Sequence, residues 1–128
     1  MAITHSTAFR NTVADAHTTA LGASPKLKFR LAGTVAAPGV AAATLTLAAT
    51  PFGASASGVA TANAIASDTA AAGNATAVAN ATLETSGGVV VSHCAVAASG
   101  SDINMSGGLV IGVGDTVSCS SLTYTSMP

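Results

Sequence analysis

Short segments in which alanine alternates with Thr, Asn, Val or Ile fill the middle of the chain, and glycines separate them. Val59–Ser67 has alanine at every second position, and so does most of Asn74–Glu84. Alanine alone favours helix, but Thr, Val and Asn at alternate positions lower helix propensity. The bounding glycines Gly58, Gly73 and Gly87–Gly88 have the spacing expected of short strands. The pattern predicts the short strands of an all-β sandwich or barrel, and we expect a jelly-roll-like β-sandwich with one N-terminal helix.

That helix is predicted over Ser6 to Leu21. Ser6 or Thr7 can cap its first turn through a side-chain oxygen, and Gly22 followed by Pro25 ends it. Apolar side chains recur at spacings of four, three and four residues, which predicts one face that packs on the sheet. The residues of this face are Phe9, Val13, Ala16 and Ala20.

The segment Lys26–Leu31 alternates strictly between basic and apolar side chains. In a strand, one face would carry the apolar residues Leu27, Phe29 and Leu31, and the other would carry three of the chain's four cations, Lys26, Lys28 and Arg30. We expect this strand at a solvated edge of the sheet. Two interpretations then stay open: the cations contact an acidic partner surface, or they only block edge-to-edge pairing. In the second case the apolar loop Gly33–Ala41 is the expected contact.

Further strands are predicted on both sides of the alanine-rich region. Ala42–Ala49 would direct Leu45 and Leu47 to the core, and Val89–Val96 is the most β-prone stretch of the chain. Ser101–Thr125 is predicted to be a terminal hairpin.

Within this hairpin, a first strand over Ile103–Ile111 is interrupted by glycines, and Gly112–Asp115 turns the chain. The last strand is expected over Thr116–Thr125. Its apolar residues change parity part-way along, which predicts a bulge near Ser120–Ser121.

The composition predicts one domain that associates with other chains. Residues 1–128 are the size of one ordinary domain, with an N-terminal segment and helix over 1–24 and the sandwich over 25–128. Hydrophobic residues make up 49% of the chain but aromatic residues only 3%. Because alanine buries little area, the core of a monomer would be thin, and we expect a homo-oligomer.

Charge and targeting signals exclude several partners. With a net charge of -1 and 7% charged residues, the chain has no broad basic surface for nucleic acid or an anionic membrane. The start of the chain lacks the basic and apolar regions of a secretory signal, and no apolar run is long enough for a spanning helix. We expect a soluble protein made in a cytoplasm, with no nucleic-acid or membrane partner.

No group of residues has the spacing of a catalytic, metal or cofactor site. His5, His17 and His93 are scattered, and no nucleophile elbow or dinucleotide-binding glycine motif is present. We therefore expect no enzyme activity, no metal and no cofactor. Cys94 and Cys119 are predicted to be two reduced core thiols, although neighbouring strands would permit a disulfide.

Four stretches, taken in order, are spread along nearly the whole length of the chain: STAFRNTVADA (Ser6–Ala16), KLKFRLAG (Lys26–Gly33), LTLAATPFGASASGVATANAIASDTAAAGNATA (Leu45–Ala77) and SGSDINMSGGLVIGVGDTVSCSSLTYT (Ser99–Thr125). Together they resemble a family of small virion structural proteins of tailed bacteriophages. The resemblance implies a capsid decoration, or cement, protein that binds the major capsid protein on the outside of the phage head, after synthesis in the bacterial host cytoplasm. A tail- or fibre-associated adhesin module is the alternative, and a small hydrolase is a remote third.

The partner contact is predicted on the N-terminal third of the chain. It would comprise the segment Met1–Ser6, with Ile3 and His5, and the face formed by Lys26, Lys28 and Arg30. A contact made by these cations should weaken as salt screens it.

Overall fold

The computed structural model describes residues 3–34 and 36–127. Within them lie one helix, α1 (Thr7–Leu21), and eight strands. The strands are β1 (Lys26–Arg30), β2 (Ala41–Leu47), β3 (Val59–Thr61), β4 (Ile65–Ala66), β5 (Asn80–Glu84), β6 (Val90–Ala97), β7 (Ile103–Asn104) and β8 (Thr123–Thr125).

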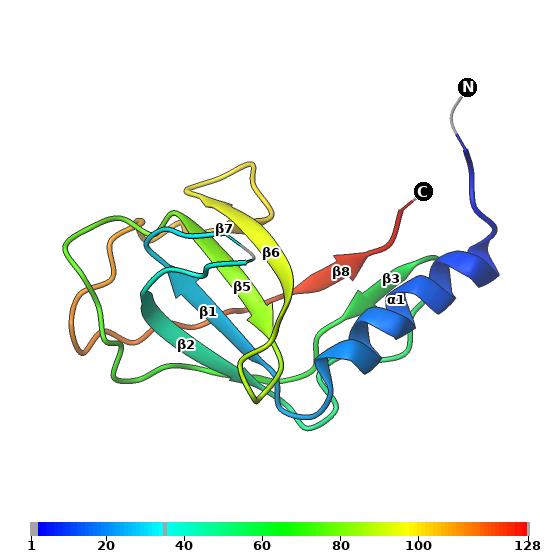
Figure 1. The fold of residues 1–128 in the computed structure, drawn as a ribbon, viewed down its shortest axis with the longest axis horizontal. Coiled ribbons are helices and arrows are strands. Elements are labelled where there is room, and N and C mark those ends of the chain that lie inside the picture. Colours follow the sequence, from blue (N-terminus) through cyan, green and yellow to red (C-terminus); the bar gives the residue numbers. More distant parts are fainter. Residues whose placement is uncertain (1–2, 35, 128) are drawn as a thin grey trace.

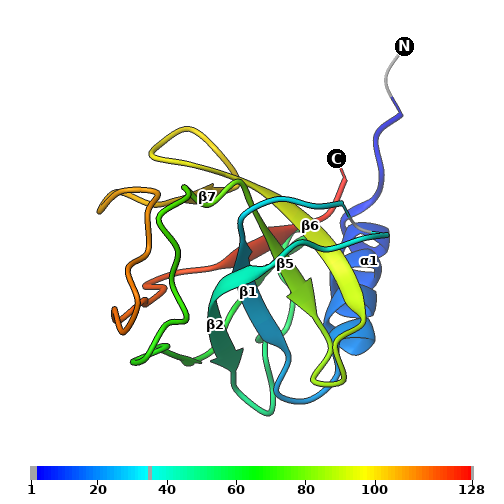
Figure 2. The same cartoon turned by 60° about the vertical axis from the view of Figure 1, so that its left-hand side comes forward.

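Six strands form one sheet in the order β4-β2-β1-β5-β6-β7, and Figure 2 shows the curl of its central strands. All neighbours in this sheet are antiparallel except β6 and β7, which are parallel. The remaining strands, β3 and β8, pair with each other and lie beside α1 (Figure 1). We call α1, β3 and β8 the helix lobe, because they project to one side of the curled sheet.

The predicted helix is confirmed, with its capping residues. The Ser6 hydroxyl accepts a hydrogen bond from the Phe9 amide at 3.2 Å, which satisfies one of the free donors of the first turn. Gly22 follows the last turn with φ of +71° and donates its amide to the Thr18 carbonyl. Glycine adopts this left-handed conformation without strain, so the helix ends there.

The predicted packing face of α1 is wrong. Of its residues only Val13 is half-buried; Phe9 is 48% exposed and Ala16 and Ala20 are also exposed, whereas Ala14 and Leu21 are buried. The face that packs also carries polar side chains. Among them, Asn11 accepts a hydrogen bond from the Gly58 amide, and the His17 ring bonds to Ser92. Apolar periodicity alone therefore pointed to the wrong side of the helix.

The core lies against the apolar face of β1 and its neighbours. Its large buried side chains include Leu27, Phe29, Leu45, Leu47 and Leu83. The inward alternation predicted for the basic strand is confirmed at Leu27 and Phe29, while Leu31 is only half-buried. The strands predicted over Ala42–Ala49 and Val89–Val96 are confirmed within one or two residues as β2 and β6.

The alanine-alternating segments form shorter strands than predicted. Val59–Ser67 is split between β3 and β4, which belong to different sheets. In Asn74–Glu84 the strand begins only at Asn80, because the preceding backbone bonds elsewhere. The Asn74 amide donates to the Ile111 carbonyl and the Val78 amide to the Leu109 carbonyl, each at 2.7 Å.

The predicted terminal hairpin is wrong. β7 pairs in parallel with β6, and β8 pairs with β3, so the two strands never pair with each other. The turn at Gly112–Asp115 is confirmed by a hydrogen bond from the Asp115 amide to the Gly112 carbonyl. Residues 116–122 contain only an isolated bridge, between Val117 and Asp68, so the expected bulge at Ser120–Ser121 lies outside any strand. Pairing with distant strands satisfied this backbone in place of a local partner.

The β-rich class with one helix is thus confirmed. A jelly roll distributes eight strands over two sheets in a Greek-key order, whereas here six strands form one sheet and two the other.

Candidate interaction site

The basic strand β1 lies in the middle of the sheet, not at its edge. β2 pairs with it on one side and β5 on the other, both over its full length. The expectation of a solvated edge is therefore wrong, and so is the interpretation that its cations block edge-to-edge pairing. Both backbone edges of β1 pair with neighbouring strands. The alternation of side chains within β1 gives no information about these neighbours.

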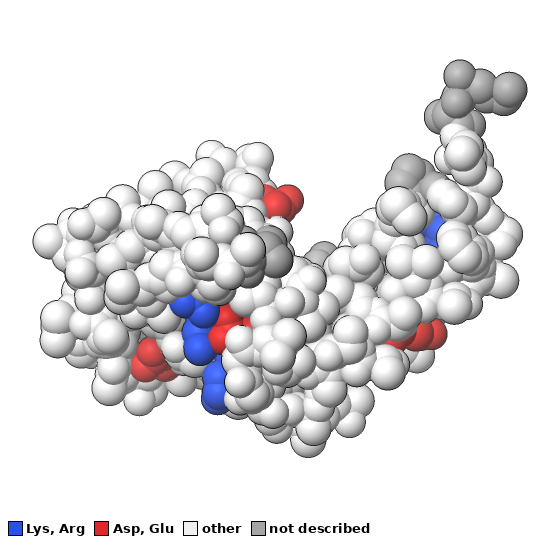
Figure 3. Space-filling view, viewed as in Figure 1, with Lys and Arg blue, Asp and Glu red and all other residues white. Residues whose placement is uncertain are grey.

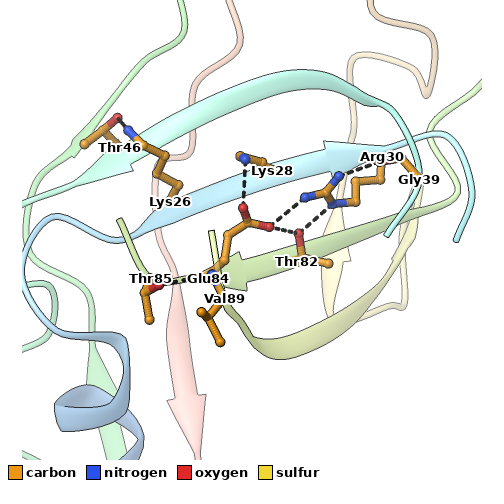
Figure 4. Close-up of polar contacts among 9 residues, drawn as sticks. All are labelled: Lys26, Lys28, Arg30, Gly39, Thr46, Thr82, Glu84, Thr85 and Val89. Atoms are coloured by element: carbon orange, nitrogen blue, oxygen red, sulfur yellow. Dashed lines mark hydrogen bonds and ion pairs between the residues drawn. The ribbon is translucent and has the colours of Figure 1, made fainter. Parts of the chain in front are cut away.

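Glu84 of β5 lies among the cations of β1 (Figure 4). Its Oε1 is 2.7 Å from Lys28 Nζ, and its Oε2 is 2.7 Å from Arg30 Nη2. The Thr82 hydroxyl completes the cluster: it donates to Glu84 Oε2 and accepts from Arg30 Nε, both at 2.9 Å. We call Lys28, Arg30, Thr82 and Glu84 the ionic cluster.

The ionic cluster holds a charged carboxylate inside the protein, since the Glu84 side chain is only 1% exposed. Burial raises the pKa of the Glu84 carboxyl, but hydrogen bonds from Lys28, Arg30 and Thr82, together with the charge of Lys28, outweigh it. The pKa of Glu84 is therefore lower than its ordinary value. At neutral pH the carboxylate offsets part of the repulsion among the three cations.

The three predicted contact cations differ in how far a partner can reach them. Arg30 is buried, and its guanidinium also donates to the Gly39 carbonyl. Lys28 is 25% exposed beside its carboxylate. Lys26 is half-buried and donates to the Thr46 hydroxyl at 3.3 Å, outside the ionic cluster. Only Lys26 and Lys28 therefore offer charge to a partner without rearrangement.

Exposed valines lie at the margins of this basic face. Val40 follows Gly39, the residue bonded to Arg30, and is 69% exposed; Val89 lies beside Glu84 and is 66% exposed (Figure 4). On the face seen in Figure 3, basic side chains gather around one acidic group, and most of the remaining surface is uncharged. We call Lys26 and Lys28 the basic face, and Val40 and Val89 are exposed apolar residues next to it in the chain and the sheet. Lys28 and Arg30 both pair with Glu84 and Lys26 bonds to the Thr46 hydroxyl, so the cations of β1 outnumber the carboxylate among them.

The other predicted contact residues lie on the segment that precedes α1, away from the basic face. Ile3 is 80% exposed on the segment that precedes α1, and this segment leads away from the rest of the molecule (Figure 1). His5 is half-buried and stacks on Phe9 with ring centroids 5.0 Å apart. Met1 and Ala2 lie outside the described residues. The sequence-based contact therefore divides into two separate surfaces.

The remaining candidate groups serve packing. Cys94 and Cys119 are free and half-buried, and burial raises the pKa of both thiols. His17 is the histidine that joins elements: its ring stacks on Tyr124 at 3.8 Å, and Nε2 lies 2.6 Å from Ser92 Oγ. Among residues 3–34 and 36–127, no three His, Cys, Asp or Glu side chains are placed to hold a metal ion.

Comparisons with protein-family models, curated proteins and solved structures found no match to this chain. In the part of the chain that the structure describes, no helix has both the length and the apolarity needed to cross a membrane.

Sequence reasoning missed Glu84, although a signal was present. It is the only glutamate in the chain, and it ends an otherwise uncharged segment, Asn74–Glu84. A lone acidic residue in a strand pattern, together with three cations on one strand face, would have predicted their pairing across neighbouring strands.

Proposed function

We propose that this protein is a capsid decoration protein that binds the major capsid protein on the outside of a phage head and reinforces the shell. The proposal continues the sequence resemblance, and the observation that carries it furthest is the basic face. Its two accessible cations supply charge, and the exposed valines Val40 and Val89 at its margins supply apolar area that a protein partner can use.

Binding would begin with charge and be completed by burial. Lys26 and Lys28 attract an acidic surface, while Val40 and Val89 lose contact with water when the surfaces meet. The ionic cluster beneath them fixes Lys28 and the β1 backbone before contact, so little side-chain freedom remains to be lost there. Such a surface binds without any chemical step, in keeping with the expectation that the chain is not an enzyme.

The test measures the affinity of the protein for capsids that lack it, taken from a virion of which this chain is normally a component. Lys26→Glu should weaken binding at least tenfold and reduce its salt dependence, because Lys26 lies outside the ionic cluster. Ser118→Glu, which adds a negative charge on an exposed residue of the C-terminal loop, is the matched control and should bind like wild type.

The apolar part is tested separately. Val40→Ser combined with Val89→Ser should weaken binding with no change in salt dependence, whereas Val113→Ser, at a valine that is 84% exposed elsewhere, should have no effect. Wild-type affinity in both the Lys26→Glu and the double valine variants would remove the basic face from the proposal.

The number of copies of this protein per virion distinguishes decoration of the head from a role in the tail. Hundreds of copies per virion support decoration of the head, and a few copies support a tail- or fibre-associated module instead. A jelly-roll relationship belongs to the same proposal. An experimental structure of the protein on the capsid that shows a second sheet packed opposite the first would support this relationship.

A further inference from the structure

A cavity of about 520 Å³ lies between the curled sheet and the helix lobe. One wall is formed by Ser92–Cys94 of β6, and the opposite wall by residues 122–125, which include β8. Side chains of a strand alternate between its two faces, so a run of consecutive residues along a cavity indicates that the strand's edge faces it. The cavity is therefore bordered by two strand edges.

The edge of β6 toward the cavity is paired only at its far end. β5 occupies one edge of β6, and on the other edge β7 pairs only with Val96 and Ala97 among the described residues. At Ala95 the pairing is replaced by the Asp102 carboxylate, which accepts the Ala95 amide at 2.9 Å. Backbone groups two residues apart point to the same edge, so those of His93 are directed toward the cavity.

The corresponding edge of β8 is identified in the same way. The Leu122 carbonyl accepts from the Ala62 amide, and the Ser126 amide donates to the Gly58 carbonyl. Both bonds lie on the β3 side of the strand. By alternation, the backbone groups of Thr123 and Thr125 point away from β3 and toward β6.

His17 holds the two walls in place. Its ring stacks on Tyr124 of β8, and its Nε2 bonds to Ser92 of β6. Both partners also line the cavity. Apolar side chains of Leu83, Ile103 and Leu122 contribute to the lining. The cavity thus offers backbone partners on both sides and an apolar surface between them.

We propose that the cavity accepts the N-terminal segment Ile3–Ser6 of a second copy of this chain, which adds as a strand between β6 and β8. Within its own chain the segment forms no strand, and it leads away from α1 (Figure 1). The segment suits this role, because Ile3 and Thr4 are β-branched and its last residue, the helix cap Ser6, has extended backbone angles, φ −63° and ψ 152°.

Size, charge and polarity fit this occupant. Four extended residues span about 13 Å, at roughly 3.3 Å per residue, which covers the three residues of β8. The segment carries no acidic or basic residue other than His5, so it brings little charge into a cavity whose charged lining residue is Asp102. Ile3, which is 80% exposed in its own chain, would be buried against Leu83, Ile103 and Leu122.

Because the segment and its own cavity lie on different parts of the molecule, the exchange links two chains. It does not depend on capsid binding, and its test contains no capsid. A variant that lacks residues 2–5 keeps the Ser6 cap, so α1 should still form. At micromolar concentration, sedimentation equilibrium should show the full chain as a dimer or larger and the shortened chain as a monomer.

A peptide of residues 1–6 should bind the shortened chain with one peptide per protein, measured by calorimetry. The same peptide with Ile3→Asp should bind at least tenfold more weakly. Thr123→Pro removes an amide from the free edge of β8 and should abolish peptide binding, whereas Thr123→Val keeps the amide and should preserve it. A monomeric full chain, unchanged association after the deletion, or no peptide binding would each overturn the proposal.

Discussion

Arg30 and Glu84 form an ion pair diagonally across β1 and β5, with Nη2 2.7 Å from Oε2. In the strand register, Glu84 lies opposite Lys26 and Arg30 opposite Asn80. The carboxylate therefore leaves its direct neighbour and reaches along the strand to Lys28 and Arg30. In a sheet rich in small, interchangeable alanines, such a diagonal contact distinguishes the native register from one shifted by two residues.

Glu84→Gln should lower the free energy of unfolding by about 3 kcal/mol, because it leaves the buried Arg30 without a counter-ion. Asp115→Asn is the matched control. It also neutralises a carboxylate, but on an exposed turn where the amide oxygen can still accept from the Gly112 amide. Urea denaturation at pH 7 measures both. Equal stability of the two variants would mean that the ionic cluster contributes nothing.

The contribution of Glu84 should depend on pH. Its pKa is lower in the folded protein than the ordinary 4.5, so its contribution is fully present above about pH 4.5. It is lost as the pH falls through the folded pKa, where the native carboxylate also takes up a proton. The stability difference between wild type and Glu84→Gln should shrink between pH 5 and pH 2. A difference that stays constant over this range would contradict the lowered pKa.

His17 should make the protein less stable in mild acid. Burial lowers the pKa of His17 from its ordinary 6.5, so the unfolded chain binds a proton more readily than the folded one. Stability should therefore be greatest above pH 6.5 and fall below it, until the folded pKa is passed. Fluorescence of Tyr124, the only tyrosine in the chain, can follow unfolding.

Replacing His17 with Phe keeps a ring against Tyr124 and removes the titrating group. The Phe variant should lose most of the decrease in stability between pH 7 and pH 5, whereas His93→Gln, at an exposed position of β6, should retain it. If both variants show the wild-type decrease, the pH dependence arises elsewhere.

Gly73→Ala should be strongly destabilising. Gly73 has φ of +65°, and a Cβ atom there would lie 2.3 Å from the Val113 amide nitrogen. Backbone cannot yield as a flexible side chain can, so we expect a loss on the order of 2 kcal/mol or more. Gly107→Ala meets open space without a positive φ and should have almost no effect. Thermal unfolding of the two variants gives the comparison.

The parts of the fold that were predictable are those coded by neighbouring residues. Ser6 and Gly22 define the ends of α1 through local hydrogen bonds and backbone conformation. The alternation of Lys26–Leu31 and the leucines of β2 identified strands and their buried faces, because the periodicity of a strand is contained in its own sequence.

The parts that were not predictable depend on distant partners. Ser101–Thr125 has the turn of a hairpin, yet its strands pair with β6 and β3. The packed face of α1 includes His17, whose contacts with Ser92 and Tyr124 cannot be predicted from a helical period. For the candidate site, the cations were found, but the pairing of β1 on both edges and the burial of Glu84 required the sheet order.

The pairing of β3 with β8 has a consequence during protein synthesis. Val59 of β3 can pair only after Thr125 of β8 has been synthesised, and α1 is made before either strand. At 5–20 residues per second, α1 is complete roughly 5 to 20 s before β8 appears. A helix of 15 residues is marginal in water by itself, and without Tyr124 one face of His17 has no ring to stack on. Until β8 is made, α1 can pack only through its contacts with β3 and β6, and the last strand completes that packing when Tyr124 stacks on His17.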